Sequence, residues 1–393
     1  MRAFLLPGPG LAGDLNDFAA WAAAIGRDGL GRAYDQPISF PPVMPWLWAA
    51  LDALMPGFAS AAASSGTVDP FVNITMKLPA TLADLGLAGA IAWAVRGRGA
   101  GGWWALLAGL ATAFQPAAIF ISAVWGQFES LYVLPIVVAY LLAIRGRLGW
   151  AGIALAIALM TKPHALPLAL PFVAFVFGRG GVRGLVLPAL TGGLTIAILW
   201  APFVAAGGPA RYVETLRHYG DLFAVLSLRA WNPWWLVQLP FGIDRYVADT
   251  NSIVGPLTFR LVGGLVAVLL GAAIALWVAR RPTAQSLAWG LVAVSLAAFC
   301  ALTTMHERYL YPAVILLPLL WPDRRAVALW TALSVAFGFN LLASTVAPVS
   351  GPGSIVGGPL GIAGSLAVTG SLVGALLALR HVSRWAPEAR VPA

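Results

Sequence analysis

The stretch GLVLPALTGGLTIAILWAPFVA, residues 184–205, indicates the fold class, because none of its 22 residues carries a charged side chain. A helix of about 20 apolar residues crosses the hydrocarbon core of a bilayer, so this stretch predicts a membrane-spanning helix. The whole chain has a similar composition, since its 393 residues are 60% hydrophobic and only 10% charged. A soluble core cannot bury so much apolar surface, and the composition therefore predicts an all-α polytopic membrane protein.

Apolar runs of helical length, bounded by Arg, Gly or Pro, predict about 11 spans, several of them shorter than an untilted crossing needs. The first six cover 78–95, 103–121, 129–144, 149–162, 164–178 and 184–205. The other five follow a polar interval and cover 259–279, 285–303, 309–321, 326–344 and 359–379.

Arg residues cluster at every second junction between these spans, and the positive-inside rule places those junctions on the cytoplasmic side. Most of the acids stand in two loops at the opposite junctions. The sequence therefore predicts five regions. They are a first outer loop with interfacial helices (1–77), an N-terminal transmembrane module (78–205), a second outer loop (206–258), C-terminal transmembrane helices (259–380) and a cytoplasmic tail (381–393).

One apolar segment does not fit as a span. FPPVMPWLWAALDALMPGF, residues 40–58, contains four Pro and an Asp. Counting it as a crossing would place Arg96 and Arg98 outside and invert every later loop. We therefore predict a helix that lies in the outer interface, with Trp46 and Trp48 at headgroup level.

The basic character of the chain does not indicate a nucleic-acid partner. Its pI is near 10.3, but the basic residues stand in short clusters between apolar runs, where membrane topology explains them. The single cysteine, Cys300, lies inside an apolar run, so no disulfide framework is expected. The partner that the composition predicts is the membrane itself.

Ionisable residues at predicted membrane depth or at the outer ends of spans are few, and burying them costs several kcal/mol unless they have partners or a function. They are Lys77, Asp84, Glu129, Lys162, His164, His306, Glu307 and Arg308. Most of them face the same side as the acids Asp14 and Asp17 of the first outer loop. Basic groups gathered beside an acidic loop at the outer leaflet suit an anionic lipid headgroup as substrate.

Simpler interpretations of several of these residues stay open. Lys77 fits a long basic chain that snorkels at a span end, and Asp84 fits a structural role inside the bundle. Glu129 fits an acid favoured by a helix N-terminus, and Asp14 fits the cap of an interfacial helix. For the adjacent groups of MHERYLYP, residues 305–312, we favour function, because three neighbouring ionisable side chains at a span end are costly.

Six motifs in this order resemble the bacterial membrane mannosyltransferase-like proteins of the GT-C superfamily. They are GDLNDFAAW (13–21), FPPVMPWLW (40–48), KLPATLAD (77–84), WGQFES (125–130), TKPHAL (161–166) and MHERYLYP (305–312). The family is similar to eukaryotic glucosyltransferases that use dolichyl-phosphate-glucose. Their first loop also carries a Gly-Asp motif with a Trp seven residues after the Asp, as Asp14 and Trp21 stand here.

The resemblance implies a GT-C-like enzyme that transfers a sugar, with inversion, from a polyprenyl-phosphate donor to a lipid or glycan acceptor at the outer face of a bacterial plasma membrane. It assigns the catalytic base to Asp14, with Asp17 as the nearby alternative, and mannose as the sugar. Glucose and arabinose stay open. The family has a membrane helix before this acidic loop, whereas only 13 residues precede Asp14 here, so we expect an upstream first helix to be missing from this sequence.

The expected chemistry needs no cofactor. A carboxylate takes the proton of the acceptor hydroxyl, and cations hold the departing phosphate through charge-assisted hydrogen bonds. The candidates for phosphate binding are Lys162, His306, Arg308 and Lys77, and further site candidates are Gln127, Glu129, Glu307 and Tyr309. We expect no metal, because the sequence shows no His and Cys ligand cluster.

Two other functions compete with this one. Buried acids and Pro-broken helices also mark ion-coupled membrane transporters. Against a transporter, the sequence shows no matched halves, and its acids concentrate in outer loops rather than at mid-membrane. A lipid-binding scaffold is the third interpretation, and it would not need the acids near Asp14 together with the groups near His306.

Overall fold

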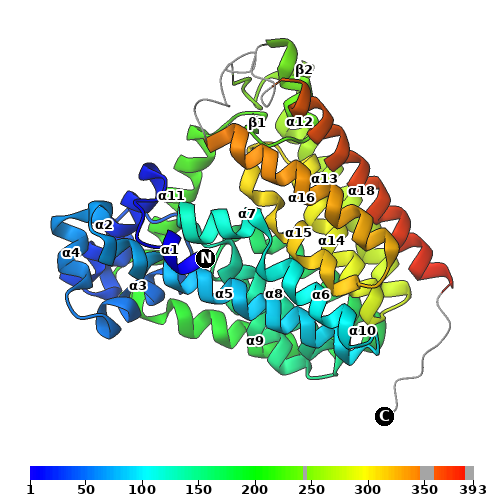
Figure 1. The fold of residues 1–393 in the computed structure, drawn as a ribbon, viewed down its shortest axis with the longest axis horizontal. Helices are drawn as coiled ribbons and strands as arrows, with labels where there is room; N and C mark the ends of the chain where they lie inside the picture. The colour runs from blue at the N-terminus through cyan, green and yellow to red at the C-terminus, as the bar shows by residue number, and fades with distance from the viewer. Residues whose placement is uncertain (242–245, 346–357, 386–393) are drawn as a thin grey trace.

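The computed structural model describes residues 1–241, 246–345 and 358–385, and within these ranges the protein is built almost entirely of helices. Figure 1 shows the N-terminal helices α1 to α4 grouped at the left, a bundle in the centre, and α18 running along the right-hand edge. The α-helices of the first half of the chain are α1 (Arg2–Leu5), α2 (Ala12–Asp28), α3 (Val43–Leu54), α4 (Phe58–Ser64), α5 (Pro70–Gly97), α6 (Gly102–Ala113), α7 (Pro116–Ile119), α8 (Glu129–Ile144) and α9 (Leu148–Leu159).

The second half continues with longer helices. They are α10 (Leu166–Val204), α11 (Gly208–Leu222), α12 (Pro233–Gln238), α13 (Phe259–Arg280), α14 (Ala284–Ala301), α15 (Tyr311–Leu316), α16 (Arg324–Thr345) and α18 (Pro359–Trp385). Short 3-10 helices cover Leu30–Asp35, Gly66–Val68, Pro163–Ala165, Leu239–Phe241, Glu307–Leu310 and Leu317–Leu320, and a π-helix covers Phe120–Trp125.

Four short strands lie in the second half of the chain. The strand β1 (Ser227–Leu228) pairs in parallel with β4 (Met305–His306), and β2 (Ser252–Val254) pairs antiparallel with β3 (Leu257–Thr258). The first pair ties the loop before α12 to the segment between α14 and α15.

Among the described residues, six helices are long and apolar enough to cross a membrane, in agreement with an all-α polytopic helical protein. One candidate, Pro163–Val204, has 42 residues. A continuous helix of that length would extend about 63 Å, twice the hydrocarbon core. It is interrupted at Gly181, where φ is 56° and ψ is −154°, between the predicted spans 164–178 and 184–205.

A second break divides the predicted span 103–121. The helices Gly102–Ala113 and Pro116–Trp125 pass the membrane test together and are bent by 41°. Pro116 explains the bend, because it has no N–H for the helix ladder and pushes the residue before it out of helical geometry. Gln115 takes an extended conformation there and accepts a hydrogen bond from the Ala117 N–H through its side chain, which caps the second piece.

The helix predicted in residues 40–58 is present as α3, but the prediction that both of its Trp residues lie at headgroup level is wrong for one of them. Trp46 is 40% exposed and donates from Nε1 to the Leu199 carbonyl. Trp48 is fully buried, because its ring packs against Phe18 and Phe128. Residues 1–77 therefore form a packed layer, whose aromatic core also includes Phe128 and Phe203.

The end of the chain and part of the second outer loop are described incompletely. Helix α18 continues to Trp385, so the first residues of the predicted tail 381–393 are helical, and 386–393 lie outside the described residues. Within the predicted loop 206–258, residues 242–245 also lie outside them.

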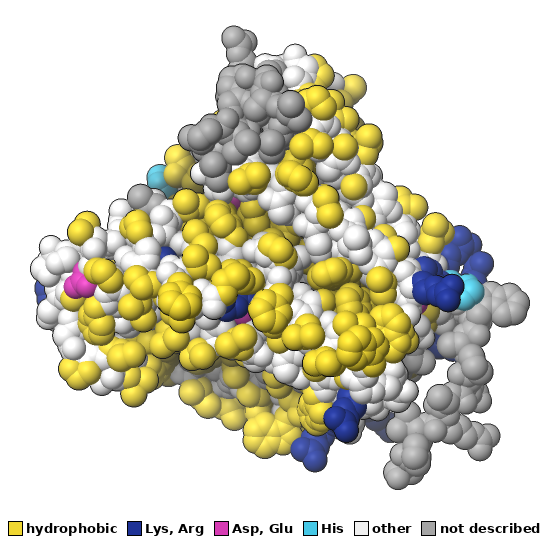
Figure 2. Space-filling model, viewed as in Figure 1, with side chains coloured by type: hydrophobic (Ala, Val, Ile, Leu, Met, Phe, Trp, Pro, Cys, Tyr) yellow, Lys and Arg dark blue, Asp and Glu magenta, His cyan; other side chains and the backbone are white. Residues whose placement is uncertain are grey.

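Basic residues gather away from the N-terminal layer. Figure 2 shows Lys and Arg at the right-hand and lower edges, near the end of α18 and below α10, whereas hydrophobic side chains dominate the face between.

Buried inside the bundle, Asp84 accepts hydrogen bonds from Arg2, Ser122 and Tyr311 at 2.6, 2.5 and 2.7 Å. This arrangement agrees with the structural role considered for Asp84.

Candidate active site

A cavity of about 790 Å³ lies where α2, α11 and the segment after α14 meet. It brings together candidate residues that the sequence predicts across almost 300 positions. These are Asp14, Asp17, Gln127, Lys162, His164, His306, Glu307, Arg308 and Tyr309. Glu129 lies directly behind the residues that line the cavity, where it contacts Lys162 and Arg308.

Asp14 stands in the first turn of α2, where the partial positive charge of a helix N-terminus favours a carboxylate. Its Oδ2 atom accepts hydrogen bonds from Trp125 Nε1 at 2.9 Å and from Gln127 Nε2 at 2.6 Å. Its Oδ1 atom accepts none from the described residues. The carboxylate is thus fixed through one oxygen and keeps the other available for a ligand.

A glycine-dependent turn presents these two donors. The π-helix ends at Gly126, whose φ is +92°, and the side chains on either side of it reach Asp14. A Cβ atom on Gly126 would lie 2.8 Å from Leu15 Cδ1, and one on Gly10 would lie 2.8 Å from Leu15 Cδ2. Leu15, fully buried next to Asp14, is therefore clamped between two glycines, which fixes the start of α2 against the turn.

Two buried cations stand across the cavity from α2 and share Glu129. Lys162 Nζ contacts Glu129 Oε2 at 2.6 Å, and Arg308 Nε lies 3.7 Å from Glu129 Oε1. Arg308 Nη1 also contacts Glu307 at 3.5 Å and His306 Nδ1 at 3.3 Å. Arg308 Nη2 and two of the three Lys162 protons have no hydrogen-bond partner among the described residues, so both cations keep donors for an anion.

The chain around Lys162 explains how it reaches the cavity. Helix α9 ends at Leu159, and Pro163 cannot continue it, so Lys162 is extended with φ at −152°. The Lys162 amino group and the Arg308 guanidinium both lie 5.4 Å from the centre of the Tyr309 ring. The ring is packed on one side by His164 at 3.7 Å, which leaves it little freedom to move.

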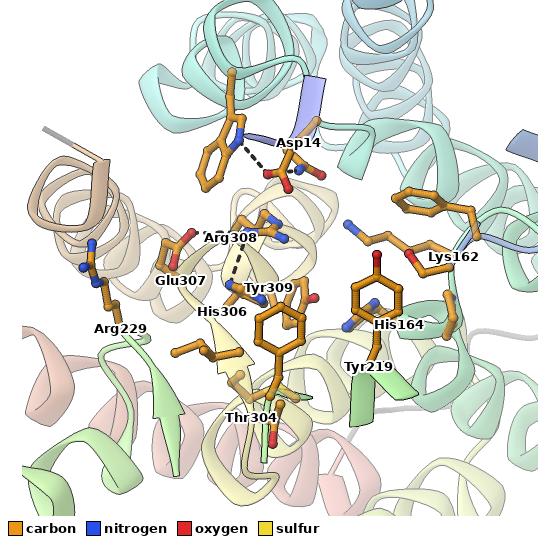
Figure 3. Close-up of a pocket in the computed structure, with 18 of the residues that line it drawn as sticks. Asp14, Lys162, His164, Tyr219, Arg229, Thr304, His306, Glu307, Arg308 and Tyr309 are labelled. Carbon is orange, nitrogen blue, oxygen red and sulfur yellow. Dashed lines mark hydrogen bonds and ion pairs between the residues drawn. The ribbon is translucent and has the colours of Figure 1, made fainter. Parts of the chain in front are cut away.

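His306 lines the cavity as predicted, but as a neutral ring. Burial, together with the adjacent Arg308 charge, lowers the pKa of His306 well below its usual range. It therefore offers a neutral donor or acceptor at pH 7, and the positive charge available to a phosphate comes from Lys162 and Arg308. In Figure 3 the Arg308 side chain lies between His306 and Asp14.

Lys77 is the one predicted phosphate ligand that the structure does not bring to the cavity. Its side chain is fully buried, and Nζ donates to the Gly8 carbonyl at 2.6 Å. The alternative interpretation, a Lys that snorkels into the headgroups, is wrong for the same reason. Lys77 instead ties α5 to the segment that leads into Asp14.

Backbone strain is concentrated at the cavity. Among the described residues, Arg229 and Thr304 are the non-glycine residues with positive φ, each at 63°, and both line the cavity. Such conformations cost about 1–3 kcal/mol each and cluster at functional sites. The Thr304 N–H donates to the Val225 and Leu226 carbonyls, directly before the strand that delivers His306.

Unsatisfied polar atoms surround the same space. Most buried polar atoms in proteins have a hydrogen-bond partner, so exceptions gathered in one place need an explanation. Gln127 Oε1, Glu129 Oε1, His164 Nδ1 and Arg308 Nε are buried without a hydrogen bond among the described residues. A polar ligand in the cavity would supply partners to Gln127, His164 and Arg308, which line it, whereas Glu129 Oε1 lies outside the lining and 3.7 Å from Arg308 Nε.

Several residues of the site could not be chosen from the sequence. Asp249 is fully buried and accepts from Thr303 Oγ1 at 2.6 Å and from Arg260 Nε at 3.0 Å, so it secures the turn before His306. Tyr219 and Arg229 belong to the predicted loop 206–258 and line the cavity. Their positions depend on long-range packing, which no local motif in that loop announces.

The described residues contain no group of three or more His, Cys, Asp or Glu side chains arranged to hold a metal ion. The cavity thus combines one oriented carboxylate, two cations with spare donors and several aromatic rings. Comparison of the sequence with known proteins finds no family model and no curated protein that matches the chain.

Proposed function

We propose that the protein is an inverting glycosyltransferase of the GT-C type, which moves a sugar from a polyprenyl-phosphate donor to an acceptor hydroxyl. The observation that carries the proposal is the placement of Asp14. One of its oxygens is fixed by Trp125 and Gln127, and the carboxylate shares a cavity with the spare donors of Lys162 and Arg308.

The residues support a single displacement. The acceptor hydroxyl gives its proton to Asp14 while its oxygen attacks the anomeric carbon of the donor. The bond from that carbon to the phosphate oxygen breaks, and its electron pair leaves with the phosphate. Lys162 and Arg308 stabilise the charge that develops on that oxygen. One base suffices, because a phosphate departs without being protonated, and attack from the opposite side inverts the anomeric centre.

Asp14 is preferred to Asp17 as the base. The Asp14 carboxylate is oriented by two hydrogen bonds, whereas Asp17 is exposed and accepts none from the described residues. A base that is already oriented loses less freedom when the acceptor binds. Asp17 faces the same cavity and stays the alternative.

The topology that goes with this proposal has 11 crossings, with the cavity at the outer face of a bacterial plasma membrane. Helices occupy each of the 11 predicted ranges, although several are shorter than a full crossing. Figure 2 shows Lys and Arg gathered at the right-hand and lower edges, and the positive-inside rule assigns such clusters to the cytoplasmic side.

An ion-coupled transporter is less well supported. Such a protein needs an acid at depth that can exchange its ion. Asp84 is the acid best placed for this, but it is held by Arg2, Ser122 and Tyr311, which leaves no open position for a transported ion.

Purified protein in liposomes tests the proposal. Radiolabelled polyprenyl-phosphate-mannose is supplied with membrane lipids and glycans as acceptors. The readout is the amount of labelled sugar that moves from the donor to an acceptor. We expect transfer by the wild type and weaker donor affinity in Arg308→Ala, because the phosphate loses a charged partner. Donor affinity unchanged in Arg308→Ala would remove that residue from the phosphate site, and no transfer from any polyprenyl-phosphate sugar would contradict the function.

A further inference from the structure

The walls of the cavity differ in chemistry. On the α11 side, the rings of Tyr219 and Phe223 stack at 5.9 Å with an angle of 13° between their planes. Next to this stack, which forms the aromatic surface, the His306 ring lies 6.0 Å from Phe223 with an angle of 69° between their planes. On the α2 side stands the exposed carboxylate of Asp17, one helical turn after Asp14.

Tyr219 points into the cavity. Figure 3 shows its ring in the middle of the space, with the hydroxyl directed toward the region between Asp14 and Lys162. That hydroxyl has no hydrogen-bond partner among the described residues. Tyr219, Asp14 and Asp17 line the same cavity, and partial burial together with the negative charges of Asp17 and Asp14 raises the pKa of Tyr219.

The aromatic surface is held in place at both ends of α11. At its start, Tyr212 packs on Trp200 and Tyr34 with ring centres 5.5 and 5.8 Å away. At its end, the Gly220 carbonyl accepts from Arg260 Nη2 at 3.3 Å. Because both ends are anchored, the surface is preformed and does not need a ligand to order it.

Rings opposite a carboxylate match the chemistry of a sugar. A pyranose has a face of C–H groups that packs on aromatic rings and an edge of hydroxyls that donate to a carboxylate. An anionic ligand would instead meet the like charges of Asp14 and Asp17. Of the cations that line the cavity, Lys162 and Arg308 are assigned above to the donor phosphate, and Arg229 is exposed and donates from Nη1 to the Ser344 carbonyl.

We propose, resting on the function above, that Tyr219, Phe223 and Asp17 form the acceptor subsite, and that the acceptor is a neutral sugar. The ring stacks on Tyr219 and Phe223, a neighbouring hydroxyl donates to Asp17, and the reacting hydroxyl lies at Asp14. The enzyme then extends a glycan, and an enzyme that attaches the preceding sugar must supply its substrate.

Binding without donor tests the subsite separately from transfer. The protein in lipid nanodiscs is titrated with neutral α-linked mannotriose, and with the same trisaccharide oxidised to carry one carboxylate, by saturation-transfer NMR. We expect the neutral form to bind more tightly than the oxidised form. Tyr219→Ala should weaken binding about tenfold through the lost stacking, and Asp17→Asn by a similar factor through the lost charge-assisted bond.

Matched variants separate these effects from misfolding. Tyr219→Phe keeps the ring and should bind nearly as the wild type, and Val213→Ala, on an exposed part of α11, serves as the control. Equal binding of the two trisaccharides, or wild-type affinity in both Tyr219→Ala and Asp17→Asn, would overturn the subsite. Transfer to lipid hydroxyls without any saccharide binding would also overturn it and leave the proposed function standing. Saccharide binding that depends on Tyr219 without any transfer would support the subsite and count against the proposed function.

Discussion

Replacing Gly126 by Ala tests whether the turn at the end of the π-helix positions Asp14. An L-residue in the left-handed conformation costs about 1–2 kcal/mol, and Gly126 has φ at +92°. The added Cβ would also lie 2.8 Å from Leu15 Cδ1, in a socket that Gly10 closes from the other side. Overpacking of this kind costs about 1–3 kcal/mol, so the expected total is about 2–5 kcal/mol.

Gly146→Ala is the matched control, because Gly146 has φ at +73° and its Cβ would meet nothing within 4 Å. It should lose only the conformational part, about 1–2 kcal/mol. The displaced turn should also misplace the partners of Asp14, and a shift near 1 Å can reduce catalysis about 100-fold. Leu15→Val in the Gly126→Ala background removes the clashing Cδ atoms and should restore part of the transfer rate.

The assays are the midpoint of thermal unfolding in detergent and sugar transfer in liposomes. Gly126→Ala should unfold at a lower temperature than Gly146→Ala and transfer far more slowly. If the two variants have the same midpoint and both transfer at the wild-type rate, the proposed clamp on Leu15 does not orient Asp14.

Three further predictions follow from the buried groups. Glu129→Gln removes the counter-ion of Lys162 and Arg308 and should lower the free energy of unfolding by about 3–5 kcal/mol. The double variant Glu129→Gln/Lys162→Met should recover part of this loss in thermal unfolding, because it also removes one of the buried cations. Asp249→Ala leaves the Thr303 hydroxyl unpaired and should cost about 1–3 kcal/mol, and an unchanged midpoint would argue against this bond. The pKa of His306 is lower in the folded protein than in the unfolded chain, so the unfolded chain binds a proton at a higher pH. The free energy of unfolding should therefore fall as the pH drops below about 6.5, and it should fall less steeply in His306→Gln. The same pH dependence in both proteins would contradict a neutral ring.

Helices were the part of the fold that composition alone could predict. A run such as 184–205 must form its hydrogen bonds internally in a bilayer, so its apolar length is enough to predict a helix. The breaks at Pro116 and Gly181 also follow local rules, since one removes a donor and the other takes a conformation that favours glycine. The short strands β1 and β4 gave no signal, because two residues are too few to show an alternating pattern.

The site was predictable where a motif carried its own chemistry, and not where a side chain reached across the fold. Lys162 and Arg308 were chosen for their charge and depth, and both line the cavity. Lys77 had the same charge and a similar depth, but its amino group turns to Gly8, which spacing cannot reveal. Trp125 donates to an acid 111 positions away, so only the tertiary structure identifies it as a partner of Asp14.

Donor binding and sugar transfer, measured separately in Asp14→Asn, show whether Asp14 is the catalytic base. Asn keeps the size of Asp14 but cannot accept the acceptor proton, whereas the donors of Lys162 and Arg308 are unaltered. If Asp14 is the base, Asp14→Asn keeps wild-type affinity for polyprenyl-phosphate-mannose and loses transfer, and Asp17→Asn transfers at a near-normal rate when the acceptor is saturating. Full transfer by Asp14→Asn, with transfer lost in Asp17→Asn, would contradict this assignment and move the base to Asp17.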